Sequence, residues 1–580
     1  MVTKGNIPDE WRLSRMSMIY KGKGDKSDIR NYRPITVTPV IYRLVMQIIK
    51  NRLEEWVDCE GILGELQNGF RKQRRLEDNI FSLTQCIEIA QKENRQLWLA
   101  FLDIKGAYDN VNQKTLWDIV ESLNLDEGLT AILRNIYKDN KVIITWEGKA
   151  AGKIEIGRGL RQGCPLSPLL FMLYLRGLED RLEKSGLGFD LSYSKLGQTI
   201  QQSLPGLIYA DDIVLMANKR IDLQELMSIC GREGEELGLE FSSEKSAVMI
   251  FNNDDVERLK IQNITVERAS KYKYLGVWIC GGAEYLSEHE KYIIGKGNRN
   301  AAVMKNRALW NYNRYEVVRE IWKGVMVPGL TFGNAVLCMK SEVHARLEIK
   351  QRGVGRLALG AHCKTPNQGV QGDMGWASFE GREAVSKIEF EDRLRQMGGE
   401  QWARKVFSYL YMRSIDTKWR QRTRKLRGKF LGYSGVTEEQ VSVKKKVKAT
   451  ERDRWLEGMQ TKKALEGYRL NKTVIAKESI YDNSRGSSLL FEARTGVLRT
   501  RTYRAKYQEM DTVCAACGEE DETAEHLILY CKGLHPMPTE DNIDLIRSLG
   551  FRDSEGKVDF KTVEITKQRL SEWWQKAREN

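Results

Sequence analysis

The stretch LIYADDIVLMA, residues 207–217, places two adjacent carboxylates, Asp211 and Asp212, between two apolar runs. Its pattern predicts a β-hairpin with the aspartates at the turn. Asp-Asp is an unfavourable pair for a two-residue turn, and adjacent anions repel each other when they are partly buried. The hairpin is therefore either an exposed turn with solvated carboxylates or part of a site that supplies positive charge.

Asp103 favours the second interpretation. It ends another apolar run, LWLAFLD, which predicts a buried strand from Leu97 to Asp103. A carboxylate at the end of a buried strand, together with the aspartate pair on the hairpin, predicts a shared site for divalent cations. Carboxylate oxygens suit Mg²⁺, and two such ions about 3.5–4 Å apart can stabilise both the attacking and the leaving oxygen of a phosphoryl transfer.

The composition fits a globular intracellular protein. Hydrophobic residues make up 41% and charged residues 30% of the 580 positions, which is enough for a core. No apolar run approaches the roughly 20 residues of a membrane helix, and the N-terminus lacks a signal core, so a secreted or membrane role is not expected. The net charge of +14 favours a polyanionic partner, although a basic pI that serves solubility explains it as well.

Helical and strand patterns alternate over the first 280 residues, with helices expected at about 38–57 and 76–92. The alternation is not strictly β-α-β, so the α+β class is expected. From about 285 to 480 the pattern is helical and rich in Trp, Arg and Lys, and the tail forms a smaller unit. The predicted domains are 1–283, 284–480 and 481–580.

The tail contains a candidate zinc site. Its ligands follow the spacing Cys-x2-Cys-x8-His-x4-Cys, at Cys514, Cys517, His526 and Cys531. Two thiolates on a tight turn, with His and Cys on a following helix, can bind Zn²⁺ tetrahedrally.

Two basic stretches, KWRQRTRKLRGKF (418–430) and VKKKVKATERDRW (443–455), lie in the helical region. They indicate phosphate contacts by the basic residues and base stacking on Trp419 and Phe430. The alternative is a solvated helix face without a ligand.

Five blocks of the sequence, FLDIKGAYDNV, GLRQGCPLSPLLFMLYL, LIYADDIVLMA, GLEFSSEKSAVMIF and YKYLGVWI, occur in the order of the palm motifs of reverse transcriptases. Their wording resembles the non-LTR (LINE-type) retrotransposon branch, and two upstream blocks, ending in NYRPITV and beginning with QNGFRK, resemble that branch's finger motifs. The resemblance covers residues 5–280. It implies a right-hand polymerase fold: fingers and a palm with an antiparallel sheet (1–283), a helical thumb and connection (284–480), and a C-terminal zinc knuckle (481–580).

The resemblance also assigns catalytic roles. Asp103, Asp211 and Asp212 match the aspartates that bind two Mg²⁺ ions, and the backbone carbonyl of Ile104 is a further ligand. Lys245 aligns with a lysine that protonates the leaving pyrophosphate. A surface lysine before a strand is an equal alternative for Lys245.

The remaining matches concern the substrates. Tyr108 matches the aromatic residue that closes the space beside the sugar 2′ carbon and so favours deoxynucleotides, with a core tyrosine as the alternative. Gln162 and Gly163 match a pair beside the incoming nucleotide and template. Arg71 matches a finger arginine that contacts the triphosphate, and Arg33 resembles another. The primer grip corresponds to Tyr274, Leu275 and Gly276, whose apolar character suits core packing equally.

The resemblance thus implies an RNA-directed DNA polymerase that transfers dNTPs to a primer 3′-hydroxyl on an RNA template. The implied location is intracellular, in a ribonucleoprotein of the nucleus and cytoplasm. Its expected partners are the RNA template, the DNA primer or target, and dNTPs. We expect the chain to be a fragment of a larger element-encoded protein with an upstream endonuclease region. The alternatives are an intron maturase-like reverse transcriptase and an inactive nucleic-acid-binding protein with the same fold. The tail knuckle argues against the first, and the intact aspartates argue against the second.

Overall fold

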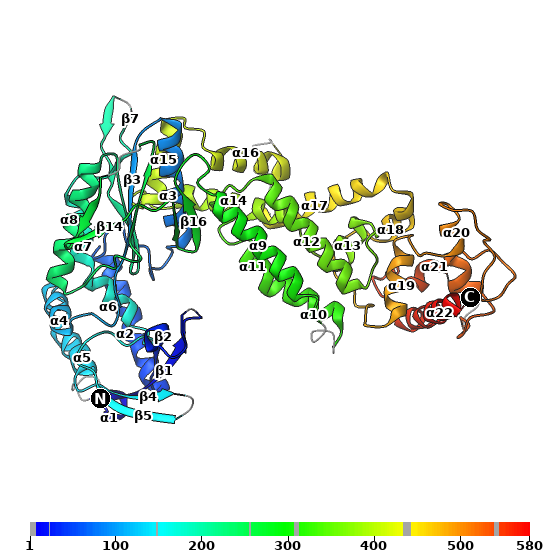
Figure 1. Cartoon of the computed structure of the whole chain (residues 1–580), viewed down its shortest axis with the longest axis horizontal. Coiled ribbons are helices and arrows are strands. Elements are labelled where there is room, and N and C mark those ends of the chain that lie inside the picture. Colours follow the sequence, from blue (N-terminus) through cyan, green and yellow to red (C-terminus); the bar gives the residue numbers. More distant parts are fainter. Residues whose placement is uncertain are drawn as a thin grey trace. The chain divides into compact units, whose positions relative to one another are not determined.

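The computed structural model describes residues 7–22, 24–146, 149–195, 197–253, 257–306, 312–432, 442–538 and 544–579. The chain forms two compact units. The first unit contains Met1–Glu288 and Arg393–Lys418, and the second contains His289–Asp392 and Trp419–Asn580. Both helices and sheets are present (Figure 1), as the α+β prediction requires.

A four-stranded antiparallel sheet carries the aspartates in the first unit. Its order is β10 (Gly206–Tyr209), β11 (Asp212–Ala217), β3 (Leu97–Asp103) and β12 (Ala247–Phe251). Helices α3 (Leu76–Lys92) and α8 (Arg220–Leu237) pack on it. The strand β3 is buried from Leu97 to Leu102, which explains why its sequence is apolar at consecutive positions rather than alternating.

A second sheet of the first unit has the order β2-β1-β4-β5. Strand β1 pairs antiparallel with β2 and parallel with β4. The bounds are β1 (Leu13–Tyr20), β2 (Tyr32–Val37), β4 (Lys141–Trp146) and β5 (Lys149–Glu155).

A separate hairpin joins β15 (Lys271–Tyr274) to β16 (Val277–Cys280). Its turn residues, Leu275 and Gly276, have φ of +43° and +84°, the left-handed conformations that a type I′ turn needs. The ring of Tyr272 stacks on Phe101 of β3 with centroids 4.3 Å apart. The hairpin is therefore packed against the aspartate-bearing sheet.

The other elements of the first unit are short ladders and surrounding helices. The ladders are β6 (Phe189–Asp190) with β9 (Ser203–Leu204), β7 (Tyr193–Lys195) with β8 (Gln198–Ile200), and β13 (Leu259–Ile261) with β14 (Ile264–Val266). The helices are α1 (Asp9–Arg12), α2 (Val40–Cys59), α4 (Gln113–Ser122), α5 (Glu127–Tyr137), α6 (Ser167–Tyr174), α7 (Arg176–Lys184) and α15 (Trp402–Met412).

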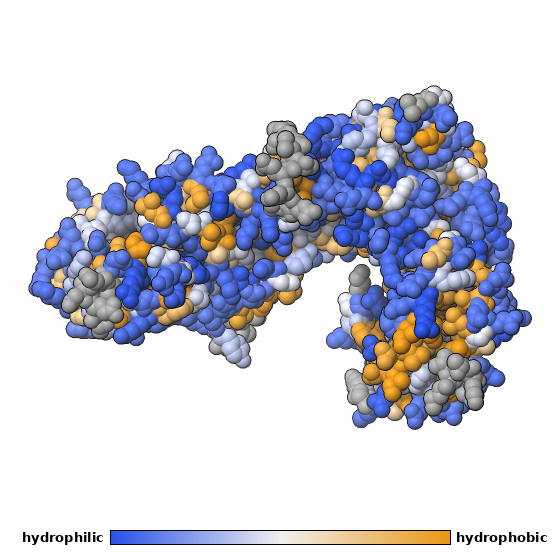
Figure 2. All heavy atoms as spheres, turned by 180° about the vertical axis from the view of Figure 1, so that it is seen from behind, coloured by the Kyte–Doolittle hydropathy of each residue, from blue (hydrophilic) through white to orange (hydrophobic). Residues whose placement is uncertain are grey.

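Helix α2 has an exposed apolar stripe. Val40, Ile41, Leu44 and Ile48 are 79, 66, 62 and 48% exposed, and apolar residues gather visibly on the surface of the first unit in Figure 2. The opposite side of the helix, with Tyr42 and Met46, is fully buried.

The second unit is helical. Helices α9 (Ser287–Val303) and α14 (Phe379–Gln396) contain residues of both units, as does α16 (Lys418–Leu431), whose first residue, Lys418, belongs to the first unit. The others are α10 (Arg314–Ile321), α11 (Val327–Leu330), α12 (Ser341–Leu359), α13 (Asn367–Met374), α17 (Val443–Gln460), α18 (Glu466–Asn471), α19 (Arg485–Arg494), α20 (Arg501–Arg504), α21 (Leu545–Ser548) and α22 (Phe560–Glu579).

One apolar core runs through the second unit from Ile293 to Trp573 and includes Cys514 and Cys531. The predicted helical region and the predicted tail therefore share a core. The separate roles assigned to these segments stay predictions. Within the described residues, no helix is both long and apolar enough to cross a membrane.

Candidate active site

The three aspartates meet at one end of the first sheet. Asp103 is the last residue of β3 and Asp212 the first of β11, and the register places them directly opposite each other. Asp211 lies in the turn before Asp212. The ammonium of Lys245 is 3.1 Å from Asp103 Oδ2. The sheet register thus gathers carboxylates that are more than 100 positions apart in sequence.

Burial disfavours the charged form of Asp211 and Asp212. It raises the pKa of Asp211, and the neighbouring Asp103 adds to the rise. Burial also raises the pKa of Asp212 to about 6, together with the charges of Asp211 and Asp103. Lys245 lowers both pKa values but does not cancel the effect. The carboxylates therefore stand to gain from additional positive charge.

A cavity of about 1440 Å³ opens beside Asp103 and Asp211. It brings together most of the residues that the sequence predicts at the substrate. Those in its lining are Arg33, Ile104, Tyr108, Gln162, Gly163 and Lys245.

Tyr108 lines this cavity and packs against a buried phenylalanine. Its ring stacks on Phe171 of α6 with centroids 4.8 Å apart and planes 15° apart. Burial, with a smaller effect of Asp211, raises the pKa of Tyr108, so its hydroxyl stays neutral. A ring fixed in this way can restrict the volume beside a bound ligand.

Gln162 is held from two sides. Its side-chain Nε2 donates to Asp109 Oδ1 at 2.9 Å, and its backbone carbonyl accepts from Thr36 N at 2.8 Å. Asp109 was not among the predicted site residues. Its place directly after Tyr108 in the block FLDIKGAYDNV was the available signal.

Arg71 is not brought into the cavity. Its Nη1 donates to the backbone carbonyls of Gly64 and Gln67, and the cavity lining does not include it. Phe70, its neighbour, does line the cavity.

The predicted primer-grip residues lie in the β15–β16 hairpin. Tyr274 is 3% exposed, and its hydroxyl accepts from Asn79 Nδ2 at 3.3 Å. Leu275 and Gly276 form the turn itself. Tyr274 is thus a core residue, and the grip role stays a prediction.

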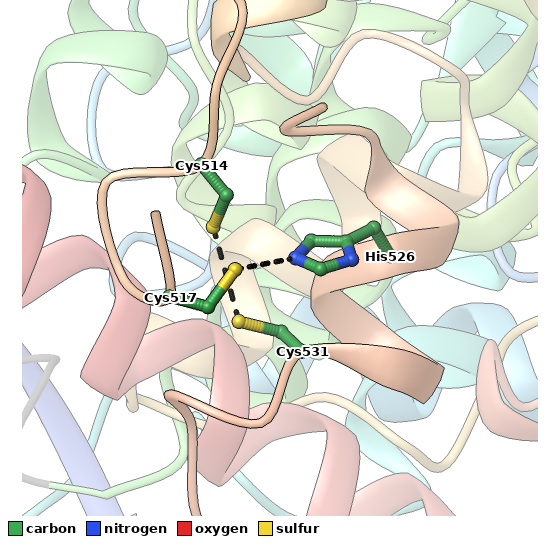
Figure 3. A group of neighbouring side chains, drawn as sticks. All are labelled: Cys514, Cys517, His526 and Cys531. Atoms are coloured by element: carbon green, nitrogen blue, oxygen red, sulfur yellow. Dashed lines mark hydrogen bonds between the residues drawn. The ribbon is translucent and has the colours of Figure 1, made fainter. Parts of the chain in front are cut away.

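The four predicted zinc ligands come together in the second unit (Figure 3). Their ligand atoms all lie within 4.8 Å of one another. His526 begins a π-helical turn (His526–Tyr530) and Cys531 follows it, whereas Cys514 and Cys517 lie on the preceding loop. His526 Nε2 faces Cys517 Sγ at 3.3 Å, and His526 Nδ1 pairs with Glu520 Oε2 at 2.8 Å.

This cluster is anchored in the core of the unit by Arg569 of α22. The buried guanidinium donates to the carbonyls of Leu527, Cys531 and Leu534 at 3.2, 3.0 and 2.8 Å. Because Arg569 is 0% exposed, these bonds form away from water and fix the chain around the last two cluster residues.

Base stacking on Trp419 and Phe430 is a wrong prediction. The two rings are only 1 and 4% exposed, and Trp419 Nε1 donates to Ala335 O at 2.8 Å. Together with Thr423 and Leu426 they form the buried stripe of α16.

The basic side chains of the two stretches divide in two groups. Several of those on α16 pair with α14 acids, as in Arg422–Glu383 and Arg427–Glu391. The lysines of α17 are exposed, namely Lys444, Lys445, Lys446 and Lys448.

The part of the chain that contains the aspartates is similar to known proteins. Residues 22–279 match the family described as "Reverse transcriptase (RNA-dependent DNA polymerase)". The Pol polyprotein of the type-1 retrotransposable element R2 from Popillia japonica is 25% identical over 63% of this chain and 50% of its own length. The corresponding protein from Nasonia vitripennis is 28% identical over 47% of this chain and 26% of its own length. The chain thus spans half or less of these relatives.

Among solved structures, telomerase from Candida albicans in complex with a fragment of telomeric RNA covers 75% of this chain and 68% of its own, at 12% identity and a TM-score of 0.37. A likeness this distant supports no argument about function.

We predict that Gly163→Ala destabilises the first unit by at least about 1 kcal/mol. Gly163 has φ of +116°, and a Cβ there would lie 2.6 Å from Thr36 O. Gly152→Ala in β5 is the control, because nothing lies within 4 Å of its added Cβ. Urea denaturation of both variants measures the difference, and equal midpoints would contradict the prediction.

Proposed function

We propose that this chain is an RNA-directed DNA polymerase, because residues 22–279 match the reverse transcriptase family and the similar proteins come from retrotransposable elements. It extends a primer 3′-hydroxyl with deoxynucleoside triphosphates along an RNA template. The observation that supports this most is the register of β3 and β11, which sets Asp212 opposite Asp103 beside Asp211 and a cavity large enough for a nucleotide.

The aspartates fit a pair of Mg²⁺ ions. The donors are hard carboxylate oxygens, and the raised pKa values of Asp211 and Asp212 indicate that these two carboxylates lack nearby positive charge. Asp103, Asp211 and Asp212 would hold the ions, with the carbonyl of Ile104 as a further ligand. When bound, such ions activate a hydroxyl nucleophile and stabilise charge on the leaving group.

The residues of the chain position the substrates. Arg33 is an exposed guanidinium at the cavity and would bind phosphate oxygens. Gln162 and Gly163 would contact the nucleotide and template, where the lack of a side chain on Gly163 permits close approach. Lys245 would protonate the departing pyrophosphate. Arg71 has no part in this proposal, since its guanidinium is bound to the loop backbone.

Primer extension on poly(rA)/oligo(dT) with Mg²⁺ tests the function. Asp211→Ala is expected to lower incorporation at least about 100-fold, since metal-bound charge stabilisation is worth several kcal/mol. Asp118→Ala is the control, because Asp118 is exposed on α4. Equal incorporation by wild type and Asp211→Ala would refute the proposal. If a folded wild type also fails to extend, a role in nucleic-acid binding alone is favoured.

Tyr108 is proposed to exclude ribonucleotides. Its stacked ring would occupy the space that a 2′-hydroxyl needs, so Tyr108→Ala is expected to raise ribonucleotide incorporation relative to deoxynucleotide by about tenfold. Steady-state kcat/KM for the two sugars measures the ratio. Tyr507→Ala, at a tyrosine 77% exposed in the second unit, is the control. An unchanged sugar preference in Tyr108→Ala would count against this role.

The cysteine and histidine cluster is proposed to bind one structural Zn²⁺. Three thiols and one imidazole are a usual donor set for this ion. Glu520 supports this assignment. Its carboxylate lies at hydrogen-bonding distance from His526 Nδ1 and would hold the proton there, which leaves Nε2, on the side of the cysteines, free to bind a metal ion.

Metal analysis of the purified chain is expected to find one zinc per chain, and none in Cys514→Ser. Glu520→Gln is expected to weaken zinc binding by about 10- to 100-fold, measured by competition with a chelator. Glu519→Gln, one residue earlier and pointing to Lys532, is the matched control. Zinc contents that do not differ between wild type and Cys514→Ser would disprove the site.

The exposed lysines of α17 are proposed to contact the phosphates of the template or primer. The first turn of this helix, VKKK, sets three positive charges at the positive end of the helix dipole, which is unfavourable without a nearby anion. An intracellular ribonucleoprotein, in nucleus and cytoplasm, is the location that such partners imply, and it too is a proposal.

The salt dependence of RNA–DNA duplex binding tests these lysines. Lys445→Gln/Lys446→Gln is expected to lower the slope of log affinity against log salt by about 0.7–0.9 for each phosphate that the variant no longer binds. Lys557→Gln/Lys561→Gln removes the same charge from other exposed positions of the unit and should leave the slope unchanged. Equal slopes in both variants would contradict the assignment.

A further inference from the structure

The turn that carries Asp211 has an unusual backbone. Tyr209 pairs with Asp212, so Ala210 and Asp211 form a two-residue turn. Ala210 has φ of +59°, a left-handed conformation that a residue with a Cβ rarely adopts and that persists only when its surroundings impose it. The surroundings of Ala210 therefore determine where Asp211 lies.

Gln67 makes the contacts that impose this conformation. Its Oε1 accepts from Ala210 N at 2.8 Å, and its Nε2 donates to Ala210 O at 3.2 Å. One carboxamide thus binds both polar groups of the strained residue. Gln67 is 2% exposed, so water does not compete for these bonds.

The close approach depends on Gly69. Its amide donates to the same Oε1 of Gln67 at 2.8 Å. A Cβ at this position would lie 2.4 Å from Ala210 N. The segment can therefore lie against the turn only because residue 69 lacks a side chain.

The backbone of Gln67 is itself fixed. Ile208 N donates to Leu66 O at 2.8 Å and Asn68 N to Ile208 O at 3.0 Å, so this segment pairs with the edge of β10. Glu179 of α7 accepts from Gln67 N at 2.7 Å and from Gly64 N at 3.2 Å.

Arg71 binds the carbonyls of the same two residues. Its Nη1 donates to the carbonyls of Gln67 and Gly64. The buried carboxylate of Glu179 thus accepts from the amides of Gly64 and Gln67. The half-buried guanidinium of Arg71 donates to the carbonyls of these two residues. The position of the Gln67 side chain is fixed before any ligand arrives.

We propose that Gln67 is a positioning residue for Asp211, held in place by Glu179 and Arg71. Its carboxamide keeps the Ala210–Asp211 turn in the conformation that directs the Asp211 carboxylate toward Asp103. This inference rests on the proposed polymerase function. It gives Arg71 a role through the loop, and the contact of Arg71 with a triphosphate stays a prediction.

Gln67→Met tests the proposal in the full chain, because methionine has a similar length and cannot form these hydrogen bonds. In primer extension, kcat is expected to fall by about 10- to 100-fold, with KM for the nucleotide changed less than about threefold. The Mg²⁺ concentration for half-maximal rate is expected to rise about tenfold, because the Asp211 ligand is no longer held.

Gln85→Met is the matched control. Gln85 is 0% exposed in the same unit, and its Oε1 accepts from Thr417 Oγ1 at 2.8 Å. The control is expected to lose thermal stability as Gln67→Met does, but to keep wild-type kcat and Mg²⁺ dependence. If Gln67→Met matches Gln85→Met in both kinetic readouts, the proposal is overturned.

Gln67→Glu keeps the test decisive if Gln67→Met fails to fold. The carboxylate accepts from Ala210 N but cannot donate to Ala210 O, whereas the protonated acid can do both. The kcat of Gln67→Glu relative to wild type is therefore expected to rise as pH falls. A pH-independent ratio near one would overturn the proposal. If wild type itself extends the primer no better than Asp211→Ala, the polymerase function is refuted and this inference with it. If wild type extends the primer and the Gln67 variants behave like Gln85→Met, only the positioning role is refuted.

Discussion

The register between β3 and β11 is the constraint on which the rest of the candidate site depends. It forces Asp103 and Asp212 to face each other across one antiparallel pair, next to Asp211. Like charges directly opposite each other destabilise a sheet, and here burial adds to the cost by raising the pKa of Asp212 to about 6. The apolar strands hold the carboxylates in place against this repulsion. A one-residue slip would move every side chain of β11 to the other face and expose the core.

A second constraint governs the other unit. Its core contains both helix residues and two members of the cysteine cluster, Cys514 and Cys531, and Arg569 binds the carbonyl of Cys531. A candidate metal site and a helical core that share residues are not independent in stability. The small tail predicted from the sequence is thus part of a larger packed body.

The sequence was most informative where the residue type and its position in a pattern both indicate the same chemistry. The aspartates at Asp103, Asp211 and Asp212 stand where polar residues interrupt apolar strands, and the four candidate zinc ligands are recognisable by spacing alone. The sequence was misleading for Trp419 and Phe430. Their spacing with Thr423 and Leu426, every three or four residues, is that of a buried helix stripe, and this signal was outweighed by the surrounding basic residues. Gln67 and Glu179 could not be found, since a buried hydrogen bond between distant segments leaves no local pattern.

The hydrogen bonds of Arg569 have a consequence for how the tail can be treated as a module. The loop and turn that carry the cysteine cluster have their carbonyls bound by a helix that begins 29 residues after Cys531, at Phe560. A segment cut out around the four clustered residues would leave that helix behind and expose its own carbonyls. The candidate zinc cluster could therefore be transferred to another protein only together with α22, whose Arg569 binds the carbonyls around it.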